Sequence, residues 1–280
     1  MKKALIVLSS VVFLFGCDLV NSGETGLSNE EIVAGLKEAL RVRTDTSVAT
    51  VSKQDGYFKD ELIKLLLPDQ VENSLNQFKA KSIDVFGLGT VTGEDIYTTG
   101  VPFLGIEPLS ATEDEIILGM NRAAETAATE AAPIFWDAIT DMTIADGTNI
   151  LFGGVDTAAT EYLNENTRPE LFTKFEPVME TALQTVQVGD TSLVYKYEQF
   201  IVEYNKVLNT TVPTGLFSSS TVGEMMNVNT VTATDLSQYA TDKGLNGLFS
   251  KVAVQEKKIR EDPAARVTEI LESVFGELDE

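Results

Sequence analysis

Histidine is absent from this chain of 280 residues, and Cys17 is its only cysteine. Without histidine the chain cannot assemble a Ser-His-Asp or Cys-His catalytic group, and it cannot ligate zinc through imidazole. A single cysteine has no partner for a disulfide within the chain. The sequence also lacks the Asp-x-Asp-x-Asp-Gly loop that organises calcium. We therefore expect no metal centre, no cofactor and no catalysis by histidine or cysteine.

Basic residues are also scarce. The chain has 21 Lys and Arg against 43 Asp and Glu, which gives a formal net charge of −22. Binding to nucleic acid needs clustered Lys and Arg, so this charge excludes DNA and RNA as partners and repels anionic lipid headgroups. Hydrophobic residues make up 43% of the chain, which argues against disorder throughout. We interpret the acidity as a solvated surface that keeps the protein soluble.

The N-terminus is basic, then apolar, and the apolar run ends at the cysteine. Two lysines precede a run that extends to Gly16 and is too short to span a bilayer. This pattern is typical of a secretory signal peptide. The string Leu-Phe-Gly-Cys that ends at Cys17 resembles a bacterial lipobox, in which the cysteine is acylated and the chain is cleaved before it. We assign residues 1–17 to a lipoprotein signal peptide, with Cys17 as the lipidation site.

Residues 18–27 contain Gly, Ser and Asn and are predicted to form a flexible tether from the lipid. The expected location is the bacterial cell envelope, with the protein anchored to a membrane by its lipid and facing the periplasm. Asp18 resembles an inner-membrane retention signal of enteric bacteria, but other phyla do not follow that rule. The sequence therefore does not decide between the inner and the outer membrane.

Residues 28–280 are predicted to form a single all-α, multi-helix domain. Apolar residues recur at helical spacing, and polar caps mark helix starts at Ser28, Thr143, Thr167 and Asp235. Residues 61–67 are predicted to form a short helix that stops at a proline. A strip of small residues, which favours the close approach of another helix, consists of Ala123, Ala124, Ala127, Ala128, Ala131 and Ala132.

Two segments, residues 81–112 and residues 209–234, depart from the helical pattern. The first alternates glycines with Ile, Val, Tyr and Phe, so we interpret it as an insertion compatible with a small β-hairpin. Its glycines lack the spacing of a dinucleotide fingerprint. The second is rich in Thr, Val and Ser and is interpreted as a linker or a second insertion. Whether the first is a binding arm or a tolerated insertion stays open.

Several stretches, in order along the chain, resemble the bacterial family called domain of unknown function 4197. They include Met120–Glu125, Pro133–Ile139, Met142–Ile144, Ala158–Leu163 and Asp262–Arg266. The resemblance extends from about residue 32 to residue 276, with both irregular segments outside it. It implies a secreted or lipoprotein-like helical protein, and it implies no activity.

This chain departs from the family pattern within predicted helices. Gly147 and Gly244 stand where the family prefers Ala, and each glycine should weaken its helix by roughly 1 kcal/mol. Asn246 stands where the family prefers Asp, so a function carried by that carboxylate would be lost here.

Four residues of the central helices could carry chemistry. Arg122 and Glu125 are three residues apart on one helical face, and Asp137 and Asp141 are four apart on another. Two carboxylates with an arginine could perform acid–base catalysis, as in glycoside hydrolysis, if a cleft brought them together. We favour a local ion pair between Arg122 and Glu125, with solvated aspartates. The single tryptophan, Trp136, is expected in the core.

Arg260 and Arg266 flank a predicted helix start at Asp262 and Pro263. They could contact an anion or a partner protein. We favour a structural role in which they tie a corner between two helices.

The leading functional hypothesis is a non-catalytic, membrane-anchored lipoprotein that binds an envelope protein or a small ligand. One alternative is a carboxylate-based hydrolase of envelope glycans, which requires an acidic cleft holding Glu125, Asp137 or Asp141. Another is a carrier of lipid or another small ligand, with an apolar cavity lined by the alanine strip together with Phe and Leu positions.

Overall fold

The computed structural model describes residues 28–87, 89–185, 187–188, 191–262, 272 and 274–275. The predicted signal peptide and tether, with Cys17, lie outside the described residues, as does Arg266. Over the described ranges the structure confirms a mostly helical single domain with small two-stranded hairpins. No helix within these ranges is both long enough and apolar enough to cross a membrane.

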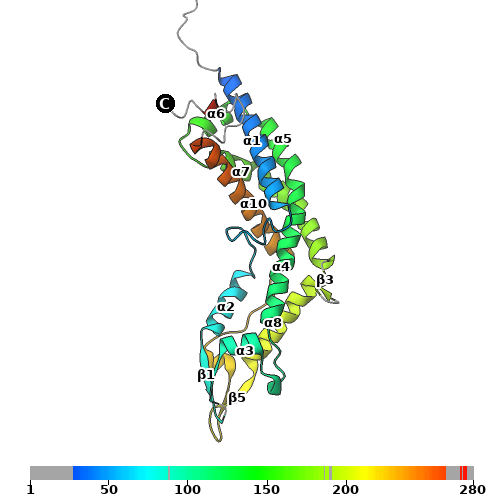
Figure 1. Ribbon diagram of the computed structural model, residues 1–280, viewed down its shortest axis with the longest axis vertical. Coiled ribbons are helices and arrows are strands. Elements are labelled where there is room, and N and C mark those ends of the chain that lie inside the picture. The colour runs from blue at the N-terminus through cyan, green and yellow to red at the C-terminus, as the bar shows by residue number, and fades with distance from the viewer. Residues whose placement is uncertain are drawn as a thin grey trace, which may run out of the picture.

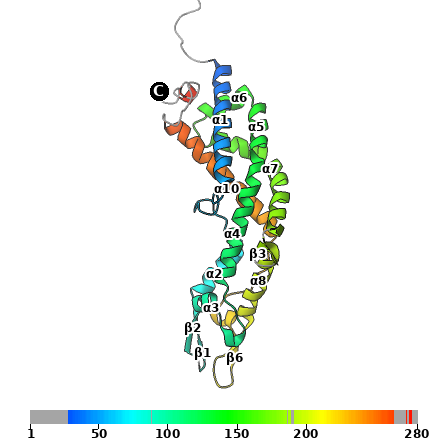
Figure 2. The same cartoon turned by 45° about the vertical axis from the view of Figure 1, so that its right-hand side comes forward.

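The molecule is elongated, with a bundle of helices at one end and short hairpins at the other (Figures 1 and 2). The bundle contains α1 (Asn29–Val51), α5 (Ala131–Asp141), α6 (Ile144–Phe152), α7 (Ala158–Thr185) and α10 (Leu236–Glu261). Nearer the hairpins lie α2 (Asp69–Lys79), α3 (Gly93–Thr99), α4 (Ser110–Ala127), α8 (Leu193–Asn209) and α9 (Val222–Met226).

The helices of the bundle begin where the sequence places strong caps. The Ser28 hydroxyl accepts from the N–H of Glu31, whose carboxylate accepts from the Ser28 N–H, and Thr143 with Asp146 repeats this box at the start of α6. Asp235 caps α10 as predicted. α1 then packs against α5, α6 and α10, while α7 packs against α4, α5 and α10.

The alanine strip lies inside this packing. Of the six alanines, all but Ala132 are buried, in α4, α5 and the short 3₁₀ turn η2 (Ala128–Glu130) between them. These segments contact α7, so the small side chains allow close helix packing.

The helix predicted for residues 61–67 does not form, and residues 52–68 make an irregular segment instead. Here side chains of α4 provide the hydrogen-bond partners that a helix would have provided. The N–H of Leu65 donates to the side-chain oxygen of Asn121 at 2.9 Å, and the Asn121 amide returns a bond to the Leu65 carbonyl at 2.8 Å. Ile63, Leu65 and Leu67 are buried in alternation, which suits an extended chain.

The helix start predicted at Thr167 is also wrong. α7 continues through this position and contains Pro169 and Pro177 in its interior. The Thr167 hydroxyl donates to the carbonyl of Leu163 at 2.6 Å, one turn earlier, instead of capping a new helix.

The two irregular segments predicted from the sequence meet at one end of the molecule. β1 (Ser82–Val85) pairs antiparallel with β2 (Gly89–Thr92), and β5 (Thr211–Pro213) pairs antiparallel with β6 (Ser219–Thr221). The N–H of Phe86 donates to the Pro213 carbonyl at 3.0 Å and links the two hairpins. We call this part of the molecule, at the bottom of Figure 1, the hairpin end. A third, minimal hairpin joins β3 (Gln187–Val188) to β4 (Thr191–Ser192) between α7 and α8.

Candidate functional site

Arg122 and Glu125 form an ion pair that fastens the irregular segment 52–68 to α4. Glu125 is buried, and its Oε2 accepts from the Arg122 guanidinium at 2.7 Å. Its Oε1 accepts from the backbone N–H groups of Tyr57 at 3.2 Å and Phe58 at 3.3 Å. Arg122 also pairs with Asp55 at 2.6 Å. Both oxygens of Glu125 are therefore occupied by groups of the protein itself.

The charges around Asp55 reinforce this connection. The Lys59 ammonium, followed by the Arg122 guanidinium, lowers the pKa of the Asp55 carboxyl. Arg122 thus lies between two carboxylates, and its guanidinium also stacks 5.7 Å from the ring centre of Phe58. This is the geometry of the local ion pair favoured from the sequence.

Asp137 and Asp141 are exposed on α5 and take no part in the Glu125 cluster. The hydrolase hypothesis needs an acidic cleft that holds these carboxylates together. Glu125 faces the buried backbone of residues 57–58 instead, so the described structure does not supply that arrangement. Within the described ranges, no group of three or more acidic residues is placed to hold a metal ion.

Trp136 is not in the core. It is 37% exposed on α5, and its indole N–H donates to Asp45 of α1 at 2.7 Å. Arg41 lies 5.3 Å from its ring centre. The side chain bridges α1 and α5 at the surface, because its N–H finds a partner there that the apolar core does not offer.

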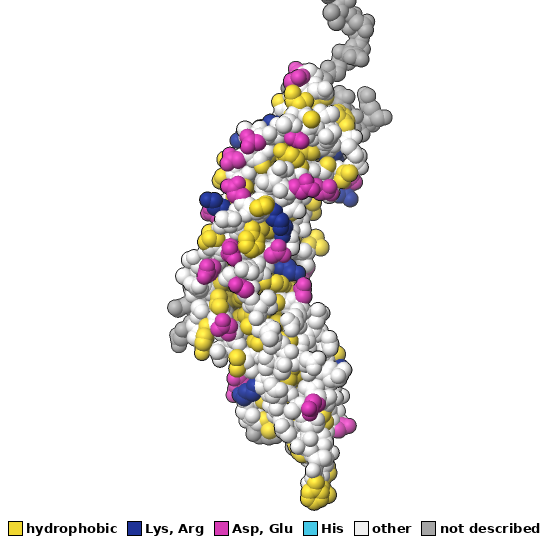
Figure 3. All heavy atoms as spheres, turned by 180° about the vertical axis from the view of Figure 1, so that it is seen from behind, with side chains coloured by type: hydrophobic (Ala, Val, Ile, Leu, Met, Phe, Trp, Pro, Cys, Tyr) yellow, Lys and Arg dark blue, Asp and Glu magenta, His cyan; other side chains and the backbone are white. Residues whose placement is uncertain are grey.

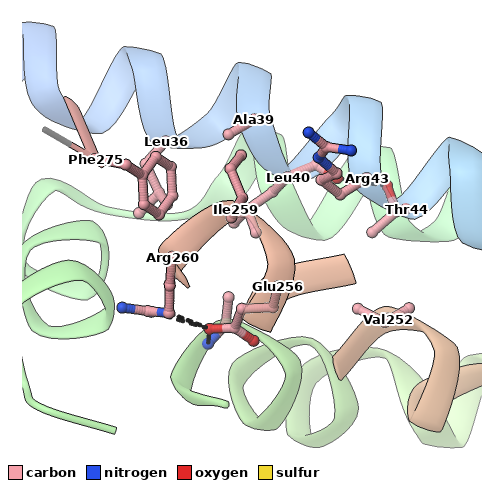
Figure 4. Close-up of a pocket in the computed structure, with 11 residues that line it drawn as sticks. Leu36, Ala39, Leu40, Arg43, Thr44, Val252, Glu256, Ile259, Arg260 and Phe275 are labelled. Carbon is pink, nitrogen blue, oxygen red and sulfur yellow. Dashed lines mark hydrogen bonds and ion pairs between the residues drawn. The ribbon is translucent and has the colours of Figure 1, made fainter. Parts of the chain in front are cut away.

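Arg260 lies at the junction of α6, α7 and α10, and Figure 4 shows its contact with Glu256. It pairs with Glu256 at 2.9 Å and donates to the Ile150 carbonyl, near the end of α6, at 2.8 Å. Glu256 in turn accepts from the N–H groups of Ala159 and Thr160, at the start of α7. The carboxylate thus meets the positive end of one helix dipole and the arginine meets the negative end of another. This is a helix-corner geometry.

The space beside Arg260 and Glu256 is too small for a ligand. The cavity bounded by this pair and by residues of α1, including Leu36 and Leu40, has a volume of about 10 Å³ (Figure 4). That is at most the room needed for a single water molecule. Arg260 therefore does not open onto a pocket able to take an organic anion.

A buried cluster that the sequence analysis missed joins α2, α3 and α4. The Tyr97 hydroxyl donates to the buried carboxyl of Glu113, and Lys79 lies 3.7 Å from the same carboxyl and 4.3 Å from the Tyr97 ring centre. Burial raises the pKa of Glu113. Glu113 precedes Ile116, Ile117 and Met120 by three, four and seven residues, so helical spacing placed it on the buried face and could have identified it.

An apolar pocket of about 280 Å³ lies at the hairpin end. Both hairpins contribute to its walls, together with α3, the start of α9 and the turn around the 3₁₀ segment η1 (Pro102–Leu104). Thr211 is its single polar lining residue; the others are Ile83, Val85, Val91, Ile96, Val101, Leu104, Ile106, Val212, Pro213 and Val222. A larger hollow of about 460 Å³ near α9 is lined mainly by polar residues, including Asn209, Asn227 and Glu224.

The pocket is formed by the two irregular segments, 81–112 and 209–234, which lie far apart in the sequence. A pocket with an almost wholly apolar lining favours an apolar ligand or part of one, because polar ligand groups would find few hydrogen-bond partners in it. It is near the lower end of the size range of small-molecule sites, which begins at roughly 300 Å³. We name this cavity the hairpin-end pocket and treat it as the candidate ligand site.

Fold and pocket together define an elongated helical domain that carries an apolar cavity at one end. The chain belongs to the family described as "Protein of unknown function (DUF4197)", which matches residues 26–86 and 104–276. No curated protein and no solved structure matches the chain. The expectation that both irregular segments lie outside the family pattern is wrong for residues 209–234, which are matched, and it holds for the first segment only at residues 87–103. The gap at 87–103 contains Val91, Ile96 and Val101, three residues that line the pocket.

Proposed function

We propose that this protein is a non-catalytic binding protein, held at the bacterial cell envelope by a lipid on Cys17, and that it binds a small apolar ligand in the hairpin-end pocket. The observation that carries the ligand class is the composition of the pocket: about 280 Å³ lined by ten apolar residues and one threonine. An acyl chain or a similarly narrow apolar group has the chemistry that such a lining accepts.

A carrier was one of the alternatives drawn from the sequence, with the cavity placed along the alanine strip. The strip is packed against neighbouring helices, whereas the pocket lies between the two hairpins. The ligand hypothesis is therefore attached to the hairpin end. The carboxylate hydrolase has no comparable support, because the Glu125 oxygens are already bonded to Arg122 and to backbone N–H groups.

A neutral fluorescent probe, N-phenyl-1-naphthylamine, tests the pocket. We expect saturable enhancement of its fluorescence with the purified full chain. Val91→Phe, which adds a ring to the wall of the pocket, should weaken binding at least tenfold. Val202→Phe makes the same change at a side chain of α8 that is 54% exposed and does not line the pocket, so it should bind like the wild type.

Equal probe binding by Val91→Phe and the wild type, or no saturable binding by the wild type, would reject the pocket as a ligand site. Circular dichroism checks that each variant is folded. If Val91→Phe proves unstable, Val101→Phe on another wall gives the same test. Mass spectrometry of lipid extracts from the purified protein would then identify the natural ligand.

The lipid anchor has its own test. The N-terminal peptide of the protein isolated from its own membranes should begin at Cys17 and carry the acyl mass, and Cys17→Ser should lose both the acyl mass and the cleavage before residue 17. An unmodified Cys17 in the protein isolated from membranes would contradict anchoring through this residue.

A further inference from the structure

We propose that the turn of the β5–β6 hairpin inserts into the surface of a lipid bilayer with neutral headgroups. This goes beyond the proposed function, since it does not require the pocket to hold a ligand. The turn presents two adjacent large apolar side chains to solvent: Leu216 is 78% exposed and Phe217 is fully exposed. Burying such a side chain away from water contributes about 1.5–3 kcal/mol of favourable free energy. A surface that covered Leu216 and Phe217 would therefore be bound with this gain.

The turn holds these side chains outward. The Thr214 N–H donates to the Ser218 carbonyl at 2.9 Å, and the two hydroxyls of the same residues are 2.9 Å apart. Leu216 and Phe217 are therefore at the tip of an ordered hairpin. In Figure 3 the end of the molecule that carries the hairpins finishes in an apolar patch at its outermost point.

The tip is at the far end from the start of α1. Figure 1 places the first turn of α1 at one end of the long axis and the β5–β6 hairpin at the other. The hairpin is thus the part of the described structure that reaches farthest from the bundle, where a flat surface could meet it without contacting the bundle. Phe86, which is 52% exposed, adds a further apolar side chain at this end through its bond to Pro213.

Long stretches of the sequence at this end contain no charged residue. Residues 85–93, 96–106 and 207–223 contain no Asp, Glu, Lys or Arg, in a chain of which 23% is charged. An uncharged apolar tip avoids the cost of bringing ions out of water into the headgroup region. The tip is therefore compatible with a bilayer surface in a way that the acidic bundle is not.

The acids that border these segments make neutral headgroups the better match. Asp84, Asp95 and Glu224 each accept a hydrogen bond from a hydroxyl near the end of a strand, of Thr90, Thr92 and Ser220 respectively. These carboxylates lie at the borders of the uncharged segments, where they would repel phosphatidylglycerol or another anionic lipid. The nearby Lys81 and Lys206 are engaged with the carbonyls of Met226 and Gly105.

A bilayer fits this surface better than a protein does. Stable protein–protein interfaces bury about 1,200–2,000 Å² in total, whereas aromatic side chains bury only about 150–250 Å² each. Two adjacent side chains on a convex tip therefore supply a small part of a protein interface. A bilayer surface conforms to a convex tip, and Leu and Phe are among the residues that interfacial segments insert.

A single tryptophan at the tip can report insertion directly. We would place Phe217→Trp in a Trp136→Phe background, so that the full chain has one indole at the tip, and add vesicles of brominated phosphatidylcholine. The matched control is Leu62→Trp in the same background, because Leu62 is 83% exposed in the irregular segment 52–68. We expect a blue shift and quenching for the tip indole and neither for the control. Adding Leu216→Ser should then weaken partitioning about tenfold or more.

Three results would overturn the proposal. The tip indole could show no change with vesicles, the control could be quenched equally, or the tip indole could shift with protein concentration in the absence of lipid. The last result would point to a second copy of the chain as the occupant. Because every variant carries the same N-terminus, the lipid on Cys17 does not affect the comparison.

Discussion

At the scale of single residues, two buried carboxylates connect elements that are distant in the sequence. Glu125 accepts two backbone N–H groups and pairs with Arg122, while Glu256 accepts two backbone N–H groups and pairs with Arg260. A buried carboxylate is tolerated when charge-assisted hydrogen bonds replace its water. Each of these glutamates therefore acts as a connector, and its role is structural.

Replacing Glu125 by alanine should destabilise the fold, because the buried N–H of Tyr57, the half-buried N–H of Phe58 and the Arg122 guanidinium lose their acceptor. We expect a loss of roughly 2–4 kcal/mol in the free energy of unfolding, measured by urea denaturation. Asp137→Ala, at an exposed position on α5, is the control and should change stability by less than about 0.5 kcal/mol. Equal stability of the two variants would contradict the connector role of Glu125.

Glu113 predicts a pH dependence. Burial raises its pKa above the ordinary value of 4.5, with smaller contributions from Glu72 and Asp114, although the Tyr97 hydroxyl and Lys79 act in the opposite direction. The folded protein thus holds this proton more tightly than the unfolded chain. Ionisation of Glu113 therefore lowers the free energy of unfolding as the pH rises above about 4.5, towards the raised folded pKa.

Glu113→Gln isolates this effect, because glutamine stays neutral at every pH. The stability of the wild type relative to this variant should fall as the pH is raised from 4 to 7, measured by urea denaturation at each pH. Glu107→Gln, at an exposed position, shows the effect of removing one negative charge from the surface. A wild type that gains stability over Glu113→Gln with rising pH would contradict the direction of the pKa shift.

At the scale of elements, the helical glycines Gly147 and Gly244 are not equivalent. A Cβ at Gly147 would lie 2.6 Å from a methyl carbon of Val33, so α1 and α6 pack too closely for alanine. At Gly244 the nearest side-chain atoms, of Ala124 and Met179, would be 3.6 Å away, which is an ordinary contact. The uniform cost expected from helix propensity ignores this difference.

The two alanine substitutions should therefore have opposite effects. Gly147→Ala should destabilise the protein by about 1–3 kcal/mol, because the helices must separate. Gly244→Ala should stabilise it by up to about 1 kcal/mol, since helix propensity improves without a clash. Thermal unfolding of both variants gives the comparison, and a stabilised Gly147→Ala would show that α1 and α6 can move apart at little cost.

Local sequence signals were sufficient to predict where a helix begins if that helix is stabilised by its own cap and apolar face. Ser28, Thr143 and Asp235 mark the starts of α1, α6 and α10 as predicted. The prediction failed for residues 61–67, because Asn121 satisfies the backbone of Leu65 from a distant position. Such a bond between residues 56 apart leaves no trace in local periodicity.

The candidate site could not be predicted for the same reason, because it depends on contacts between residues that are even farther apart in the sequence. Both irregular segments were predicted from the sequence, but their contact was not. The bond between Phe86 and Pro213 and the shared pocket depend on how the helices between the two segments are arranged. The role of Arg122 could be anticipated from its spacing to Glu125, whereas the contribution of Asp55 could not.

At the scale of the whole molecule, charge and apolar surface are distributed unequally along the long axis. The formal net charge is −22, yet the segments that form the hairpin end include three long uncharged runs. In the face seen in Figure 3, acidic side chains are spread along most of the length of the molecule, and the outermost tip is apolar. The electrostatic potential far from such a protein is set by the acidic residues outside the tip. Short-range contacts at the hairpin end are set by Leu216 and Phe217.

This separation predicts how lipid charge and salt affect insertion of the tip. Replacing part of the phosphatidylcholine by phosphatidylglycerol should reduce quenching of the tip indole, because the acidic residues outside the tip are repelled by the vesicle surface. Raising the ionic strength from 0.01 to 0.15 M shortens the Debye length from about 30 to about 8 Å and should restore much of the quenching. In pure phosphatidylcholine, salt should have little effect. Stronger quenching by anionic vesicles at low salt would mean that a basic surface, and not the uncharged tip, governs the approach to the bilayer.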